Sequence, residues 1–281
     1  MNVNRDDRRF YTSIGLVLLL VIGAYGGLVL HTGFSTPFSV VMSQSMQHDD
    51  DMSQIGCIDT GDIVVVRSPG KSDIVSYVEG HSTGYSSFGD YGSVVIYDRG
   101  NNSNPVIHRA IVWLEWDPRD NVWRSPSLED YDGWYCVGMD GQVTKDPDRL
   151  SGKLKFTDIT RSGKDVEVNL DTLGKVSGYL TMGDNPESNP NFDQTSGIVD
   201  HPIPYEDIRS VPFMEIPWMG TMKILLKNDG RNLEHVPNSL PSLLMEIVLL
   251  FSILLLVDQA FTIRNRRKNP AEEKKGEEDG K

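Results

Sequence analysis

The stretch Val40-Val41-Met42-Ser43-Gln44-Ser45-Met46 decides how this chain is organised, because it comes soon after an apolar segment. Residues 13–30 carry no charge, and Ser45 follows their end by fifteen residues. As a helix with ~1.5 Å rise per residue, the segment reaches about 27 Å and just crosses a bilayer core. We therefore expect the Ser45 hydroxyl to lie at the surface of a membrane.

A second apolar segment, residues 240–257, has the same length, and Glu246 is its one charged residue. Within lipid such a carboxyl group must face a partner, lie near an end or be protonated. Cations flank the outer sides of the two segments: Arg5, Arg8 and Arg9 before the first, and Arg264, Arg266, Arg267 and Lys268 after the second. The positive-inside rule then predicts cytoplasmic tails, residues 1–12 and 258–281, and places residues 31–239 outside the cell or in the equivalent lumen.

The first segment could also be a cleaved signal peptide, since arginines precede it. However, its apolar stretch is longer than the usual ~7–15 residues, and no small-x-small cleavage site follows it promptly. Gly26 and Gly27 keep the cleaved form open, but a retained helical anchor is the prediction.

The net charge of −13 falls almost entirely on the exterior region. Each tail contributes +1 and Glu246 contributes −1, so residues 31–239 carry −14. A surface this acidic argues against nucleic-acid binding. Asp outnumbers Glu by 27 to 13, as in halophilic proteins, where concentrated salt screens the repulsion between like charges. A merely acidic exterior is the alternative interpretation.

Between the apolar segments, runs of β-forming residues alternate with turn formers, and no amphipathic pattern is long enough to predict a helix. The expected strands are Phe38–Met42, Asp62–Arg67, Asp73–Val78, Ser93–Asp98, Val106–Trp113, Trp134–Gly138, Val166–Leu170 and Gly178–Met182. They predict a mainly β, barrel-like domain beside the membrane, with a transmembrane helix at each end. Residues 80–92 and about 115–150 are expected to be insertions on it, as surface loops or as a subdomain.

Few residues suggest disulfide bridges, attached glycans or metal sites. Cys57 and Cys136 fit one disulfide or two buried thiols equally well. Asn101-Asn102-Ser103 is a glycosylation sequon in a turn-rich stretch. The six histidines show no ligand spacing, so we expect no metal or other cofactor.

Three residue types in the exterior region suggest nucleophilic catalysis, in the order Ser, His, Asp. A serine hydroxyl attacks only if a base takes its proton and fixed donors hold the developing oxyanion. Ser45 is the candidate nucleophile, and Ser43 would project to the same side and donate to the oxyanion. His108 lies on the apolar face of an expected strand, where desolvation favours the neutral imidazole that a general base needs.

Asp184 and Asp193 are the candidate carboxylates, since a catalytic imidazole needs one to fix its tautomer and stabilise its charged form. Each of these residues also has an ordinary interpretation. Polar residues in such loops usually just form turns, and a histidine on an apolar face often bonds a core carbonyl. The order of the residues beside a membrane anchor favours catalysis.

Four ordered motifs resemble the type I signal peptidases of the archaeal and endoplasmic-reticulum kind. They are Ser43-Gln44-Ser45-Met46, Gly61-Asp62-Ile63-Val64-Val65-Val66, Ile107-His108-Arg109 and Gly183-Asp184-Asn185 with the later Asp193. The resemblance implies a membrane-bound serine endopeptidase that cleaves signal peptides from secreted and membrane precursors. In such an enzyme Ser45 attacks, His108 is the base, Ser43 assists the oxyanion, Asp193 completes the site and Asp184 supports it. With the acidic composition, a halophilic archaeon is the expected source.

The chain departs from the family pattern in three places. His48 stands where the family often has proline, and the intervals from His108 to Asp184 and from Asp184 to Asp193 are long. The last interval leaves open which aspartate orients the histidine. The expected partners are signal-peptide-bearing precursors, membrane lipid and the secretion translocon. The alternative function is that of a catalytically inactive β-domain, which would act as a binding or scaffold subunit.

Overall fold

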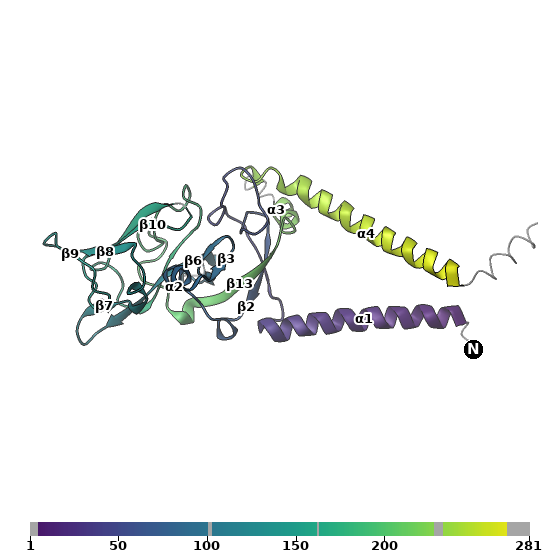
Figure 1. The fold of residues 1–281 in the computed structure, drawn as a ribbon, viewed down its shortest axis with the longest axis horizontal. Helices are drawn as coiled ribbons and strands as arrows, with labels where there is room; N and C mark the ends of the chain where they lie inside the picture. The colour runs from purple at the N-terminus through teal and green to yellow at the C-terminus, as the bar shows by residue number, and fades with distance from the viewer. Residues whose placement is uncertain (1–4, 101–102, 162, 228–232, 269–281) are drawn as a thin grey trace, which may run out of the picture.

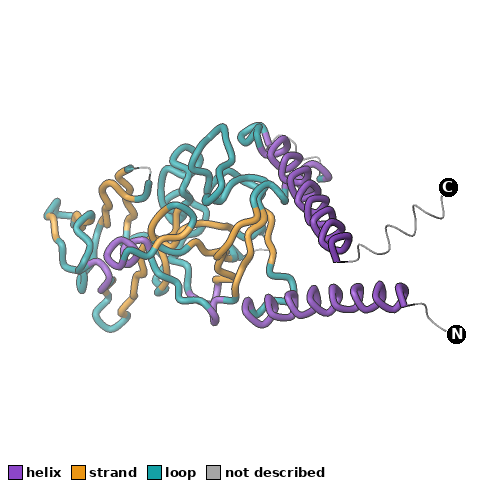
Figure 2. Tube along the Cα trace, turned by 45° about the vertical axis from the view of Figure 1, so that its right-hand side comes forward, coloured by secondary structure: helices purple, strands orange, loops and turns teal. Residues whose placement is uncertain are grey.

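In the computed structural model, which describes residues 5–100, 103–161, 163–227 and 233–268, a curled antiparallel sheet stands beside two long apolar helices (Figure 1). Helix α1 covers Arg5–Thr32 and helix α4 covers Ser239–Lys268. Their apolar parts, residues 11–32 and 239–264, are long and apolar enough to cross a membrane. Both helices leave the same end of the β-rich part, so the start of α1 and the end of α4 lie on one side (Figures 1 and 2).

The main sheet has seven strands in the order β1-β2-β13-β5-β6-β12, with β7 paired to β6. The strands are β1 Phe38–Val40, β2 Ile63–Arg67, β5 Val94–Tyr97, β6 Val106–Asp117, β7 Val122–Arg124, β12 Gly178–Met182 and β13 Ile208–Ile216. Every pair is antiparallel, and register shifts in β12–β6 and in both pairings of β13 mark bulges. Because bulges bend and twist strands, the sheet curls into a half-barrel. The expected β-rich domain with a long apolar helix at each end is thus confirmed in part: the chain is mixed α/β, and its main sheet is a half-barrel.

A second sheet, with the order β11-β10-β8-β9, is inserted between β6 and β12. Its strands are β8 Trp134–Val137, β9 Val143–Thr144, β10 Lys153–Ile159 and β11 Lys164–Asn169. The largest apolar core joins the two sheets and includes Leu154 and Phe156 of the insertion with Leu114 and Leu180 of the half-barrel. The region of about residues 115–150 is thus part of a subdomain with its own strands, which continues to Asn169.

The other insertion, residues 80–92, joins a short helix to a small hairpin. Helix α2 covers Tyr77–Thr83, and the hairpin pairs β3 Ser86–Ser87 with β4 Asp90–Tyr91. The prediction of a strand over Asp73–Val78 is wrong because Ser76 and Glu79 form a capping box that starts the helix. Gly84, with φ of 80°, ends it in the left-handed conformation.

The remaining elements are short. In the part of the chain that the structure describes, 3₁₀ helices cover Pro69–Lys71, Pro126–Leu128 and Tyr205–Asp207. Helix α3, Thr221–Leu226, follows β13 and contacts α4. Helix α3 therefore lies at the end of the half-barrel from which the long helices leave (Figure 1).

Candidate active site

Ser45 lies at the tip of a β-turn that is anchored in the core on both sides. The chain leaves β1 at Val40, and the buried side chains of Val41 and Met46 pack in one apolar cluster with Ile58. The Gln47 N–H donates to the Gln44 carbonyl at 3.0 Å, so Ser45 and Met46 occupy the central turn positions. This local structure leaves the Ser45 side chain half-buried, with its neighbours fixed.

The Gly183-Asp184-Asn185 segment, which follows β12, holds this turn from the side. The Asn185 N–H donates to the Ser45 carbonyl at 3.0 Å. A Cβ added to Gly183 would overlap that carbonyl oxygen, so the close approach of the two backbones requires glycine. The Asn185 amide oxygen accepts from the backbone N–H groups of Glu187 and Ser188, at 2.8 and 3.1 Å, which fixes the loop that follows.

His108 lies on β6, and its imidazole is tied to a buried carboxylate. Its Nδ1 lies 2.8 Å from both oxygens of Asp193, which is fully buried. Asp193 also accepts from the Tyr97 hydroxyl of β5 and the Thr181 hydroxyl of β12, each at 2.6 Å. Since the carboxylate accepts, Nδ1 carries the proton and Nε2 keeps its lone pair. This is the tautomer that a general base requires.

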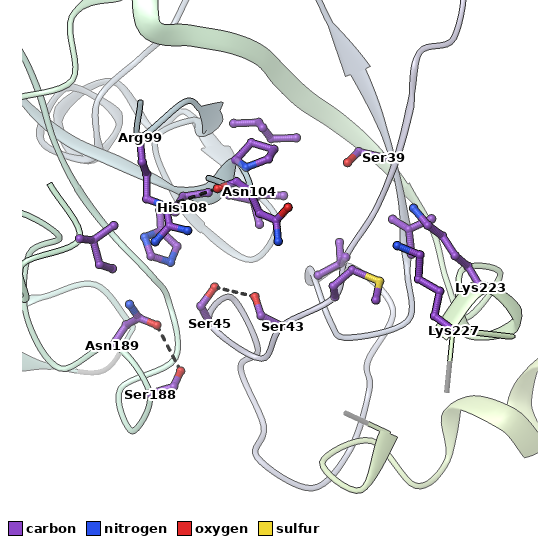
Figure 3. Close-up of a pocket in the computed structure, with 18 residues that line it drawn as sticks. Ser39, Ser43, Ser45, Arg99, Asn104, His108, Ser188, Asn189, Lys223 and Lys227 are labelled. Atoms are coloured by element: carbon purple, nitrogen blue, oxygen red, sulfur yellow. Dashed lines mark hydrogen bonds between the residues drawn. The ribbon is translucent and has the colours of Figure 1, made fainter. Parts of the chain in front are cut away.

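Ser45 and His108 line the same cavity, whose volume is about 800 Å³. Figure 3 shows the Ser45 hydroxyl pointing toward the His108 ring, with the Ser43 hydroxyl beside it at 3.4 Å. Within the described residues, no hydrogen bond joins Ser45 to His108. The cavity is an open cleft: residues 39–43 form one wall and residues 104–108 the other.

Asp184 is held away from His108 by other partners. The Arg109 Nε donates to Asp184 Oδ1 at 2.8 Å, and Arg109 Nη2 pairs with the other oxygen. Arg109 is fully buried and also donates to backbone carbonyls of the β3–β4 hairpin, among them Tyr91 at 3.0 Å. Burial alone would raise the pKa of Asp184, but the Arg109 charge and hydrogen bonds lower it to about 2. The structure thus brings Asp193 to the histidine and gives Asp184 a separate place.

A cluster that the sequence did not reveal connects the Ser45 loop to Asp184. The His48 Nε2 lies 3.2 Å from Asp184 Oδ2, and its Nδ1 lies 3.1 Å from the Cys57 sulfur. Burial of His48 lowers its pKa, but its bonds to Asp184 and Cys57 outweigh burial and raise it to about 9. His48 therefore links the segment after Ser45 to the segment after β12.

Asp62 belongs to a group of buried carboxyl groups below the turn. It accepts from the Asp59 N–H at 2.9 Å and the Trp218 N–H at 2.8 Å. Burial raises the pKa of Asp62 to about 8, of Asp59 to about 6 and of Glu215 to about 7. These contacts join the loop before β2 to the end of β13.

Both cysteines are free and buried, and burial raises the pKa of Cys136 to about 11. Asn101 and Asn102 of the sequon lie outside the described residues. In the described part of the chain, no three His, Cys, Asp or Glu side chains are grouped to hold a metal ion.

Comparison with protein families and with curated proteins found no match to this chain. Sequence reasoning named Ser43, Ser45, His108, Asp184 and Asp193 but missed Tyr97, Thr181 and His48. Tyr97 and Thr181 carry no local signal, because their contact with Asp193 depends on which strands are neighbours of β6.

Proposed function

We propose that this chain is a membrane-bound serine endopeptidase of the signal peptidase type. The observation that carries the proposal is the imidazole of His108, fixed at Nδ1 by buried Asp193 and directed at the half-buried hydroxyl of Ser45. An inert serine–histidine pair would not need a carboxylate that is itself held by two further hydroxyl donors. The order and environment of the three groups match the requirements of nucleophilic catalysis.

In the proposed reaction, His108 Nε2 takes the Ser45 proton while Oγ attacks the carbonyl carbon of the scissile peptide. The oxyanion accepts hydrogen bonds from the Ser43 hydroxyl and the Ser45 backbone N–H. The imidazolium is stabilised by Asp193 and gives its proton to the leaving amine, which leaves an acyl-enzyme on Ser45. A water molecule, deprotonated by His108, then hydrolyses the ester and restores the serine.

The proposed substrate is the N-terminal signal peptide region of a secreted or membrane precursor. Among the described residues, strand β1 pairs only with β2, and its residues Ser39 and Val40 line the cleft, so an extended peptide can add to the other edge of β1. Val40 and Met42 line the cleft there, whereas Phe38 is exposed and does not. Small side chains before the cut would fit between these walls, as signal peptide cleavage sites require.

The proposed location is the outer face of the cell membrane of a halophilic archaeon. Helices α1 and α4 would cross the membrane, both tails would be cytoplasmic, and the half-barrel would stand outside. This arrangement is supported by the shared direction of the two apolar helices (Figure 1). Membrane lipid and the secretion translocon are the proposed neighbours, because a precursor emerges there.

The decisive experiment compares wild-type chain and Ser45→Ala in membrane vesicles, with a secretory precursor as substrate. We expect the wild type to release the mature protein and the variant to bind the precursor without cleaving it. Thr195→Ala, which changes a hydroxyl group outside the cleft, is the matched control. Equal cleavage by the Ser45→Ala variant would reject the assignment. Precursor binding without turnover by the wild type would instead favour the inactive binding or scaffold subunit.

A further inference from the structure

The charge of the cleft is opposite to that of the molecule. The chain has a net charge of −13, yet among the described residues three cationic side chains, Arg99, Lys223 and Lys227, line the cleft and no carboxylate does. Arg99 lies at the His108 end and donates from Nε to the Asn104 carbonyl at 3.3 Å (Figure 3). In the described part of the chain, neither lysine forms an ion pair. The two lysines are therefore cations directed at whatever occupies the cleft.

The lysines lie at the end of the cleft that faces the long helices. They belong to α3 and the residue after it, and the preceding Gly220 packs against the Val40 side chain of β1. Helix α3 contacts α4, and its outer side chains Met222 and Leu226 are 51% and 83% exposed. Exposed apolar side chains beside two apolar helices suit a lipid surface. Figure 3 shows both lysines beyond Ser43, on the side away from His108.

A precursor anchored in lipid would enter the cleft from this end. Its apolar segment precedes the cut, so the residues that pass the lysines lie between that segment and the scissile bond. Residues 39–43 form the wall along this path. The four residue steps from Ser39 to Ser43 cover at most about 13 Å of extended chain, which a substrate peptide lying along this wall spans with about four residues.

We propose that Lys223 and Lys227 are specificity-determining residues that favour precursors with an acidic side chain about four residues before the cut. The inference rests on the proposed function and identifies the substrate class of the same site. A carboxylate at that point forms an ion pair with the lysines, whereas a lysine or arginine is repelled. Both lysines are exposed, so each pair changes the cleavage rate by about threefold rather than by orders of magnitude.

The experiment uses the full-length chain in vesicles of uncharged lipid, at the lowest salt that keeps the protein folded. Three forms of one precursor carry Asp, Asn or Lys at the fourth residue before the cut. They are cleaved by wild type, by Lys223→Glu, by Lys227→Glu and by the double variant. Lys145→Glu is the matched control, because its exposed ammonium group bonds the Asp132 carbonyl in the inserted sheet and does not line the cleft.

We expect wild type to cleave the Asp form about fivefold faster than the Lys form in kcat/KM, and the double variant to reverse this order. The preference should shrink in molar salt, where the Debye length is about 3 Å. An unchanged Asp-to-Lys ratio in the double variant would overturn the proposal while leaving the peptidase intact. A uniform loss on all three precursors that depends on added anionic lipid would overturn it too, and would assign the lysines to lipid phosphates.

Discussion

Gly183 lies so close to Ser45 that its backbone occupies the space next to the Ser45 carbonyl oxygen. We expect Gly183→Ala to push the Ser45 turn away from His108. A displacement of ~1 Å at a reacting group lowers turnover by about a hundredfold. Precursor cleavage and thermal unfolding of the variant would measure the effect. Gly70→Ala is the control, because a Cβ there meets no atom within 4 Å. Wild-type turnover by Gly183→Ala would contradict the close contact.

Asp193→Ala should reduce turnover more than Asp184→Ala. Without Asp193 the His108 ring loses the acceptor that fixes its Nδ1 proton, and comparable changes in serine proteases cost about 10⁴-fold in kcat. Asp184→Ala leaves His108 oriented but removes the partner of buried Arg109, so it should mainly lower the unfolding temperature. Single-turnover cleavage and calorimetry separate the two effects. A larger loss of turnover in Asp184→Ala would reverse the assignment.

His108→Lys should be inactive. A lysine on β6 would place its ammonium group beside Asp193, which favours the charged form and leaves no base for Ser45. Measuring cleavage from pH 6 to 10 tests whether a neutral amine appears at high pH. Appreciable activity at pH 7 would indicate a more adaptable site. Asp193→Asn combined with His108→Lys separates the effect of the carboxylate from that of side-chain reach.

The stability of the folded chain should fall as the pH rises from about 6.5 to about 9. The folded pKa of His48 is raised to about 9 by Asp184 and Cys57, against the burial that lowers it. His48 therefore adds its full stabilisation, up to about 3 kcal/mol of unfolding free energy, below its unfolded pKa of about 6.5. This stabilisation is lost as the pH rises past 9. Asp62, whose pKa burial raises to about 8, acts in the same direction, because folding protonates it.

His48→Gln should flatten this alkaline decline, and His235→Gln, a change at an exposed histidine, should not. Unfolding temperatures measured between pH 5 and 10 provide the comparison. At acid pH the relevant group is Asp184, which stabilises the fold above a pH of about 3.8. It loses this effect as the pH falls through its folded pKa of about 2. An identical pH profile for His48→Gln and wild type would show that His48 does not link the two segments.

The sequence predicted the elements whose signal is local. The predicted strand Gly178–Met182 coincides with β12. Strand β2 is one residue shorter than its prediction at its start, and β5 is one residue shorter at each end. Strand β13 was missed because Pro212 interrupts it, and prolines in strands usually indicate an edge or a bulge. In the structure a bulge between Pro212 and Met214 accommodates the proline inside the sheet.

The site was predictable only in part, because only some of its residues have a local signal in the sequence. Ser45 and His108 lie in short motifs, and their residue types alone suggest nucleophile and base. The number of residues between His108 and Asp193 does not indicate how close the two side chains lie, because the inserted sheet separates them in the chain. Which aspartate meets the imidazole depends on β5, β6 and β12 lying side by side, and Tyr97 and Thr181 follow from that order alone.

The inserted sheet begins and ends at neighbouring strands, since Leu114 of β6 pairs with Gly178 of β12. A shortened chain could therefore be built with a tight turn in place of the insertion and with the same strand order. Such a shortened chain would still be altered at the proposed site, because Phe156 of the insertion packs on Phe192, the residue before Asp193, with ring centroids 5.8 Å apart. Trimming the chain would thus loosen the packing behind Asp193, the proposed catalytic carboxylate.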